Sequence, residues 1–264
     1  MSATAVLRAV VAELRVAGML AMRYRASFLA ETVMSFGWVA WTVIPLLVVY
    51  EYRADVQGWT RDQALLVVGL FITLEGLLGA LVEPNLRAVV EQVRDGTFDY
   101  TLLKPIDTQL LVSIHRIQPT ELPHALSGLV VVGVAASRLD PLPGLGDVAA
   151  AALLLVAGLM LLHGLWTIVV ATSFWFVRVD NLSVLLRSLL DAGRWPVGYY
   201  RGIVRFVLTW IVPVGLITTF PAMALRGQLQ PQLLLATCGV SLGFSLLARA
   251  VWRFALRHYT SASS

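Results

Sequence analysis

The stretch VAAAALLLVAGLMLLHGLWTIVVATSFWFV, residues 148–177, runs for thirty residues without Asp, Glu, Lys or Arg. As an α-helix it would be about 45 Å long at 1.5 Å per residue, which exceeds the roughly 30 Å of a bilayer's hydrocarbon core. Within that core the backbone must form its hydrogen bonds inside its own segment. The stretch is therefore predicted to be a transmembrane helix that tilts or projects beyond the bilayer.

Five further apolar stretches have the length of membrane spans: 26–50, 62–82, 108–136, 203–225 and 227–248. The chain has 264 residues, of which 58% are hydrophobic and only 14% are charged, so lipid rather than charge must cover its surface. Soluble classes of protein are excluded on this ground. We expect an all-α integral membrane protein with six transmembrane helices in a single domain, residues 1–264.

The distribution of arginine predicts the orientation. Of the twenty basic residues, only Arg53, Arg61, Arg138 and Arg226 fall in the loops on one side of the expected spans. Basic residues are retained on the cytoplasmic side, so both termini are predicted to be cytoplasmic. The net charge of +4 then faces membrane lipid with anionic headgroups, and we expect no nucleic-acid partner.

Two short amphipathic segments are expected to lie along the membrane surface. Residues 4–24 place apolar and arginine side chains on opposite helical faces, although a charged leader into the first span is the alternative. Residues 84–95 begin with Pro84 and precede Gly96, which suit the first turn and the end of a helix. Arg87 and Glu91 are spaced to pair at i,i+4 in this second helix.

The membrane topology of residues 178–226 is the least clearly predicted by the sequence. Hydropathy places 178–202 in the cytoplasm and makes 203–225 the fifth span. Three prolines interrupt the stretch, and broken helices at membrane depth often line a cavity.

Several polar groups fall inside the expected spans. Glu75 lies near the middle of the second span, where it must face protein or water. It either lines a transport path or carries protons, or it makes an interhelical hydrogen bond. The third span is polar in its cytoplasmic half, where Arg116 precedes Glu121 and His124. These two residues form a titratable pair or hydrogen-bond to neighbouring helices. His163 is expected to be a packed imidazole rather than a ligand.

Two other patterns concern helix packing and catalysis. Gly239 and Gly243 form a small-xxx-small face that would let helices approach closely. The only lysine, Lys104, stands between Leu103 and Pro105, so the chain has no phosphate-binding loop. We expect no catalytic residue, metal or cofactor on this chain.

Residues 94–105, RDGTFDYTLLKP, resemble a loop of exporter permeases of the type-2 ATP-binding-cassette (ABC) class. There the pattern is Gly-Thr/Glu-Leu-Asp, two variable residues, Leu-Leu, a basic residue and Pro. A second similar region contains RWP at 194–196, IVP at 211–213 and TFPA at 219–222, with Trp195 where the family commonly has tyrosine. The ending YTSAS at 259–263 is also similar, so the resemblance covers nearly the whole chain.

The resemblance implies a permease subunit of the bacterial inner membrane that exports an amphiphilic, drug-like or lipid-like compound. It would pair with a second permease, identical or paralogous, and bind two separate ATPase subunits that carry the ATP and Mg. Residues 84–95 would be the coupling helix seated in the ATPase. Residues 194–226 could form a re-entrant segment that enters from the outer side, with the fifth span nearer 180–200.

Site residues follow from the resemblance in three groups. The ATPase-coupling group is Arg87, Glu91, Arg94, Asp95, Phe98, Asp99 and Tyr100, with Phe98 and Tyr100 as anchors. The translocation path or dimer interface would contain Glu75, Arg116, Glu121, His124 and His163, and Gly239 and Gly243 would pack helices. The rival functions are a proton-coupled secondary transporter or an intramembrane enzyme that uses Glu75, Glu121 or His124, and a non-transporting scaffold.

Overall fold

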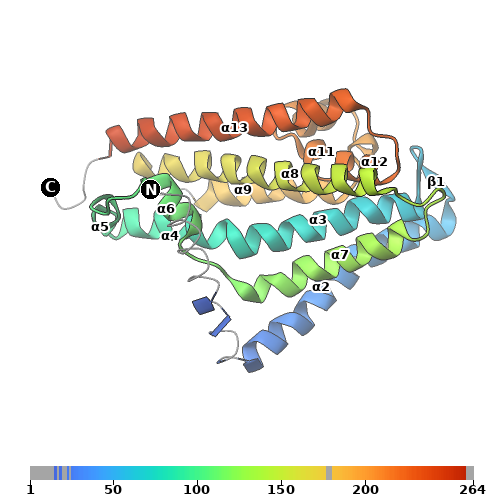
Figure 1. Cartoon of the computed structure of the whole chain (residues 1–264), viewed down its shortest axis with the longest axis horizontal. Helices are drawn as coiled ribbons and strands as arrows, with labels where there is room; N and C mark the ends of the chain where they lie inside the picture. The colour runs from blue at the N-terminus through green and yellow to red at the C-terminus, as the bar shows by residue number, and fades with distance from the viewer. Residues whose placement is uncertain (1–14, 17, 20–22, 24, 177–179, 260–264) are drawn as a thin grey trace.

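The computed structural model describes residues 15–16, 18–19, 23, 25–176 and 180–259 (Figure 1). The expected interfacial helix at 4–24 lies almost wholly outside these residues. The described part is built from helices, together with one short antiparallel hairpin of β1 (Asp55–Val56) and β2 (Trp59–Thr60).

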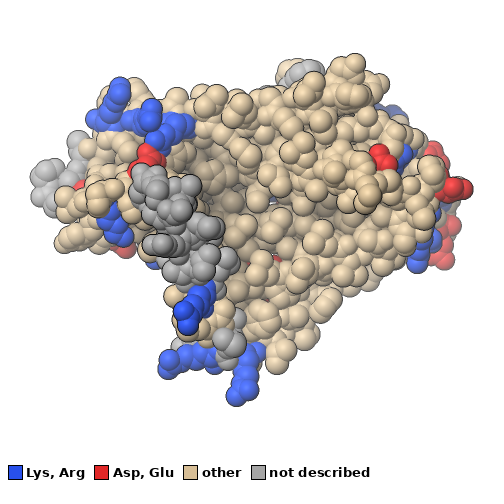
Figure 2. Space-filling view, viewed as in Figure 1, with Lys and Arg blue, Asp and Glu red and all other residues tan. Residues whose placement is uncertain are grey.

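Four described helices are long and apolar enough to cross a membrane. They are α2 (Arg25–Tyr52), α3 (Arg61–Leu81), α8 (Leu145–Ala171) and α13 (Pro231–Arg257). The helices α3, α8 and α13 lie along the long axis of the molecule, and the β1–β2 hairpin marks one end of it, here called the hairpin end (Figure 1). Charged side chains gather at the two ends of the face in Figure 2, with an almost uncharged band between them.

The opposite end, here called the α4 end, holds three shorter helices. The chain passes from α3 through Val82 directly into α4 (Glu83–Arg94), and α5 (Asp99–Leu102) and α6 (Thr108–Ile114) follow. The helix expected at 84–95 is therefore observed as α4. Gly96 ends it with a φ of 68°, in the left-handed region that glycine adopts without strain.

The expected third span at 108–136 is not continuous. After α6 the chain forms a 3₁₀ turn at Pro119–Glu121 and then α7 (Leu122–Ala136), whose fifteen residues reach about 22 Å. Proline at 119 and 123 removes backbone donors and begins a new helix at this point. The helix α7 packs very closely on α3, because a Cβ on Gly76 would lie 2.4 Å from the Ala125 nitrogen.

The chain between 180 and 226 is broken into many short pieces. It forms α9 (Asp180–Asp191), 3₁₀ turns at Ala192–Arg194 and Val197–Tyr199, α10 (Gly202–Phe206), a π turn at Val207–Ile211, α11 (Val214–Ile217) and α12 (Thr219–Leu225). The pair Gly202–Thr209 and Val214–Leu225 is bent by 57°, and counting it as one span gives up to five candidate spans in the described residues. The all-α membrane class is confirmed, whereas six full-length spans are not observed.

Contacts at both ends of this segment show its path. Near the α4 end, Arg187 binds Glu83. At the hairpin end, the Tyr199 hydroxyl lies 2.5 Å from the Tyr50 hydroxyl. The Tyr50 hydroxyl in turn donates to the Trp59 carbonyl. Arg226 also lies at the hairpin end, 4.5 Å from the centre of the Trp59 ring. The chain thus travels along the molecule between 187 and 199. The described part of 178–202 therefore reaches from one end of the molecule to the other, as the alternative with the fifth span nearer 180–200 requires.

Candidate functional site

A cleft lies between α3, α8, α9 and α11, and we call it the central cleft. Its empty volume is about 390 Å³, a figure that includes the open space at its mouth. Its walls are mostly apolar, from Phe71, Leu74, Leu78, Leu162, Leu190 and Ile217. Four charged side chains also line it: Glu75, Glu83, Arg187 and Asp191. The cleft therefore combines apolar contact area with three carboxylates and one guanidinium.

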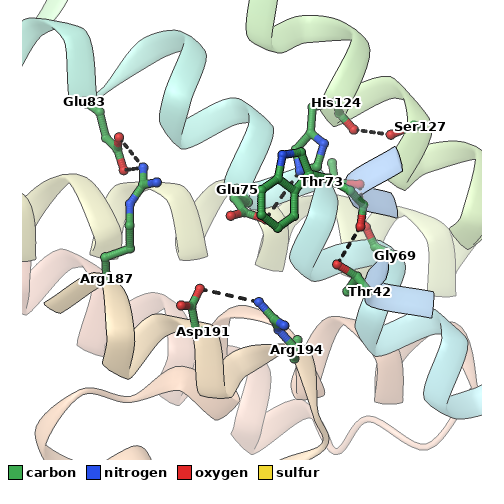
Figure 3. A network of polar contacts seen from close by, with 11 residues as sticks. Thr42, Gly69, Thr73, Glu75, Glu83, His124, Ser127, Arg187, Asp191 and Arg194 are labelled. Atoms are coloured by element: carbon green, nitrogen blue, oxygen red, sulfur yellow. Dashed lines mark hydrogen bonds and ion pairs between the residues drawn. The ribbon is translucent and has the colours of Figure 1, made fainter. Parts of the chain in front are cut away.

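The polar groups of the cleft are held by specific pairs (Figure 3). Arg187 donates to both carboxylate oxygens of Glu83, which is 7% exposed. Arg194 lies 3.7 Å from Asp191 and places its guanidinium 5.5 Å from the centre of the Phe71 ring. These contacts fix α9 and the turn after it against α3 and the start of α4.

Glu75 is paired with His124, whose Nε2 lies 3.3 Å from the Glu75 Oε2 (Figure 3). The Glu75 side chain is 38% exposed, so it faces the cleft while it holds the imidazole. This contact joins α3 to α7 and agrees with the interhelical hydrogen bond expected as one reading of Glu75, whereas the possible pair of His124 with Glu121 is not observed among the described contacts. The structure differs because Glu121 lies in the turn before α7, where its side chain packs beside Gly79 of α3.

The other predicted path residues lie elsewhere. The His163 Nε2 is 2.9 Å from the Ser113 hydroxyl oxygen, which joins α8 to α6. The Arg116 backbone is held by Asn85, which accepts from its amide and donates to its carbonyl, each at 2.6 Å. Of the five predicted path residues, the structure brings together only Glu75 and His124.

Sequence reasoning missed Glu83, Arg187 and Asp191 as cleft residues. Hydropathy placed the last two in a cytoplasmic segment, and Glu83 was given no role. A usable signal was present, because Arg187 and Asp191 are four residues apart and would share one face of a helix. Among the described residues no group of three or more His, Cys, Asp or Glu side chains is placed to hold a metal ion.

The α4 helix presents two different faces. Leu86 and Val89 are each 1% exposed and pack into the body of the protein, whereas Arg87, Glu91 and Arg94 are exposed. Arg87 contacts Glu83 at 3.9 Å rather than the predicted Glu91. Arg94 contacts the adjacent Asp95 at 3.5 Å. One side of α4 is therefore fixed while the other offers charged groups to a partner.

The two aromatic anchors predicted after α4 have different positions. Tyr100 is 72% exposed, as an anchor for a partner requires. Phe98 is 0% exposed, and its ring centroid lies 5.3 Å from Phe174, 5.6 Å from Tyr259 and 6.4 Å from Trp252. The expectation that Phe98 contacts the ATPase directly is therefore wrong for this conformation. Phe98 instead fastens the loop after α4 to the ends of α8 and α13.

The glycines predicted to pack helices make no close contact inside the chain. A Cβ on Gly239 or Gly243 would meet no atom of the described residues within 4 Å. The close helix approach lies instead between α3 and α7, where a Cβ on Gly128 would lie 2.5 Å from the Thr73 nitrogen. Among the described residues, therefore, Gly239 and Gly243 do not mark a close helix approach.

Comparison with known proteins agrees with this architecture. The family model described as ABC-2 family transporter protein matches residues 36–263, nearly the whole chain. The chain therefore belongs to the ABC-2 family of transporter proteins, and it is a multi-pass membrane protein of the permease type. Members of this family are the membrane components of ABC transporters and normally work with ABC ATPases. No curated relative and no solved structure matches the chain.

Proposed function

We propose that this chain is the membrane subunit of an ATP-driven exporter in the bacterial inner membrane. Two separate ATPase subunits would bind and hydrolyse ATP with Mg, and a second permease, identical or paralogous, would complete the transporter. The observation that carries the proposal is α4, a helix that follows α3 after the single residue Val82 and whose outer face exposes Arg87, Glu91 and Arg94. A helix with one fixed and one free charged face is suited to receive force from a bound partner.

The contacts around α4 indicate how its movement would reach the rest of the molecule. Glu83 begins α4 and is bound by Arg187 of α9, so a displacement of α4 acts on one wall of the central cleft. Phe98 follows α4 and packs on Phe174 and Trp252, so the same displacement acts on the ends of α8 and α13. Subunit and domain rotations in transporters act through packed contacts of this kind.

The central cleft supports an amphiphilic substrate. Its apolar walls would hold a hydrocarbon or aromatic body, and its charged residues would contact a polar group. Alternating exposure of such a cleft to the two sides of the membrane would export a drug-like or lipid-like compound.

The path of residues 187–226 favours a re-entrant outer segment. Tyr199 and Arg226 both lie at the hairpin end, and the bent pair α10–α12 joins them. We propose that the fifth crossing uses residues near 180–200 and that 201–225 enters from the outer side and returns to it.

Affinity purification tests the coupling role of α4. The wild-type chain, extracted in mild detergent, is expected to retain an ABC ATPase, identified by mass spectrometry. The variant R87A/E91A/Y100A removes three exposed side chains at the α4 end and is expected to lose it. The matched control E51A/Y52A/R53A removes the same residue types, which are exposed at the hairpin end, and should keep it. An ATPase that is absent from the wild type, or retained by the first variant, would overturn the proposal.

A proton-coupled secondary transporter is the second candidate, and the Glu75–His124 pair at 3.3 Å is the observation that favours it. Glu75 lines the cleft and contacts the imidazole of His124, so the two groups could pass a proton from a substrate in the cleft. Proteoliposomes that contain this chain alone separate the two candidates. Uptake driven by a pH gradient without ATPase, and lost in Glu75→Gln, would establish the secondary transporter.

A further inference from the structure

A second cavity lies beside α4, on the side that faces α6, and we call it the α4–α6 pocket. It has an empty volume of about 360 Å³ and is formed by α4, α5, α6 and the residues that follow α6. Its polar lining comes from Asn85, Gln92, Thr101, Lys104, His115 and Arg116. None of these residues belongs to the central cleft, so the pocket needs an explanation of its own.

The walls of the pocket are held in place by hydrogen bonds. Asn85 is 2% exposed, and its amide group donates to the Leu81 carbonyl at 2.8 Å in addition to holding the Arg116 backbone. The Thr101 hydroxyl donates to the Gln92 side-chain oxygen at 2.8 Å, which fixes α5 on α4. The backbone positions of Arg116 and of the turn that carries Lys104 are therefore set before any ligand binds.

The charge of the pocket is one-sided. Lys104 and Arg116 carry positive charge, whereas no aspartate or glutamate lines the pocket. Two carboxylates of the elements around the pocket are engaged elsewhere, because Arg187 binds Glu83 and Arg249 binds Asp107. The lining therefore favours an anion with several acceptor oxygens.

The surroundings of the pocket are apolar, which distinguishes it from a site for a small free anion. Val89 and Val112 of its lining are 1% and 7% exposed. Outside it, Leu102, Leu103 and Leu110 are 38%, 80% and 38% exposed. The helices that line the pocket lie at the α4 end, where α4 follows the membrane-length helix α3 (Figure 1). Basic pockets at the ends of membrane-spanning helices suit phospholipid headgroups.

We propose that the α4–α6 pocket binds the phosphate of an anionic phospholipid in the cytoplasmic leaflet. Lys104 and Arg116 contact the phosphate oxygens, and the acyl chains leave the pocket over the exposed leucines. A lipid in this position bridges α4 and α6 and steadies the helix that faces the ATPase. The ATPase is not needed for this binding. A test of the lipid site therefore gives a result that does not depend on whether the protein is an exporter.

Chemical labelling of Lys104 tests the proposal without any substitution. Because Lys104 is the only lysine, an amine-reactive reagent can modify only this side chain and the N-terminus. Phosphatidylglycerol added to the purified protein in neutral detergent is expected to protect Lys104, as read by peptide mass spectrometry. Phosphatidylcholine and millimolar inorganic phosphate are expected to leave it reactive. Equal protection by phosphate would show a site for free anions, and no protection by phosphatidylglycerol would show no site; either result overturns the proposal.

Native mass spectrometry of variants gives the second arm. K104Q/R116Q is expected to lower phosphatidylglycerol affinity about 30-fold, since each basic residue near anionic headgroups contributes about fivefold. The control R253Q/R257Q removes two exposed arginines at the same end of the molecule and is expected to leave the affinity unchanged. An equal loss in both variants would indicate general surface attraction and would overturn the proposal, as would a K104Q/R116Q variant that binds like the wild type. Size-exclusion chromatography confirms that each variant is folded.

Discussion

Arg187 of α9 binds both carboxylate oxygens of Glu83, the first residue of α4, across a separation of 104 positions in the sequence. Glu83 is nearly buried, whereas the Arg187 side chain is 52% exposed on the wall of the central cleft. The Arg187–Glu83 pair joins α4 to α9, which forms one wall of the cleft. A movement of α4 therefore displaces α9 unless the pair breaks.

The first prediction concerns the energy of this pair. Glu83→Gln and Arg187→Gln should each lower the free energy of unfolding by about 2 kcal/mol, because hydrogen bonds to charged groups contribute about 1.5–3 kcal/mol. The double variant should lose less than the sum of the two. Thermal unfolding in detergent measures each change. Arg94→Gln is the control, because its pair with Asp95 is exposed and should change stability by less than about 1 kcal/mol. Single variants that match this control would show that the pair does not stabilise the fold.

The second prediction concerns pH and the contact between α6 and α13. The hydrogen bond from Arg249 holds the pKa of Asp107 below its usual value, with a smaller contribution from the Leu110 amide. A carboxyl whose pKa is lower in the folded state stabilises the fold above its unfolded pKa of about 3.9. That stabilisation is lost as the pH falls through the lower, folded value. Wild type should therefore melt above Asp107→Asn at pH 7, and the difference between the two melting temperatures should shrink as the pH falls below about 3.9. A difference that does not shrink below this pH would contradict the assignment.

The third prediction concerns the close approach of α3 and α7. A Cβ on Gly76 would lie 2.4 Å from the Ala125 nitrogen, so Gly76→Ala must separate the two helices. Overpacking of this kind costs about 1–3 kcal/mol. Gly133→Ala on α7 is the matched control, because a Cβ there meets no described atom within 4 Å. It should stabilise α7 slightly, since alanine favours helix by about 1 kcal/mol over glycine. Equal melting temperatures for the two variants would show that α7 is not seated on α3 as described.

The fourth prediction separates the two aromatic residues that follow α4. Phe98→Ala should lower the free energy of unfolding by about 3–5 kcal/mol, as removal of a buried aromatic ring does. Tyr100→Ala should leave stability unchanged because its side chain is exposed, but it should weaken retention of the ATPase. Melting temperature and ATPase copurification are measured on the same preparations. Loss of the ATPase in Phe98→Ala with unchanged stability would restore Phe98 as a direct anchor.

The long helices of this protein follow from its sequence, whereas its broken segments and side-chain pairs do not. Long apolar runs can only be helices in a bilayer, so α2, α3, α8 and α13 were predictable, and Pro84 and Gly96 bounded α4 closely. Residues 108–136 and 178–226 were assigned less well, because hydropathy averages over breaks at Pro119, Pro196 and Pro213. The pairs Arg187–Glu83 and His124–Glu75 depend on which short helices lie side by side, and the composition of a single segment carries no information on that.

The last prediction concerns the side of the membrane on which residue 201 lies. Arg201 is exposed and follows Tyr199, which is bonded at the hairpin end. In a chain whose only cysteine has been removed (Cys238→Ser), Arg201→Cys should react with a membrane-impermeant maleimide in intact cells. Arg257→Cys, at the α4 end, should react only after the cells are opened. If Arg201→Cys also needs opened cells, residues 203–225 form a complete crossing from the cytoplasm, as hydropathy predicts. In that case Tyr199 would lie on the cytoplasmic side and Tyr50 on the outer side. That outcome would therefore also contradict the contact between the Tyr50 and Tyr199 hydroxyls.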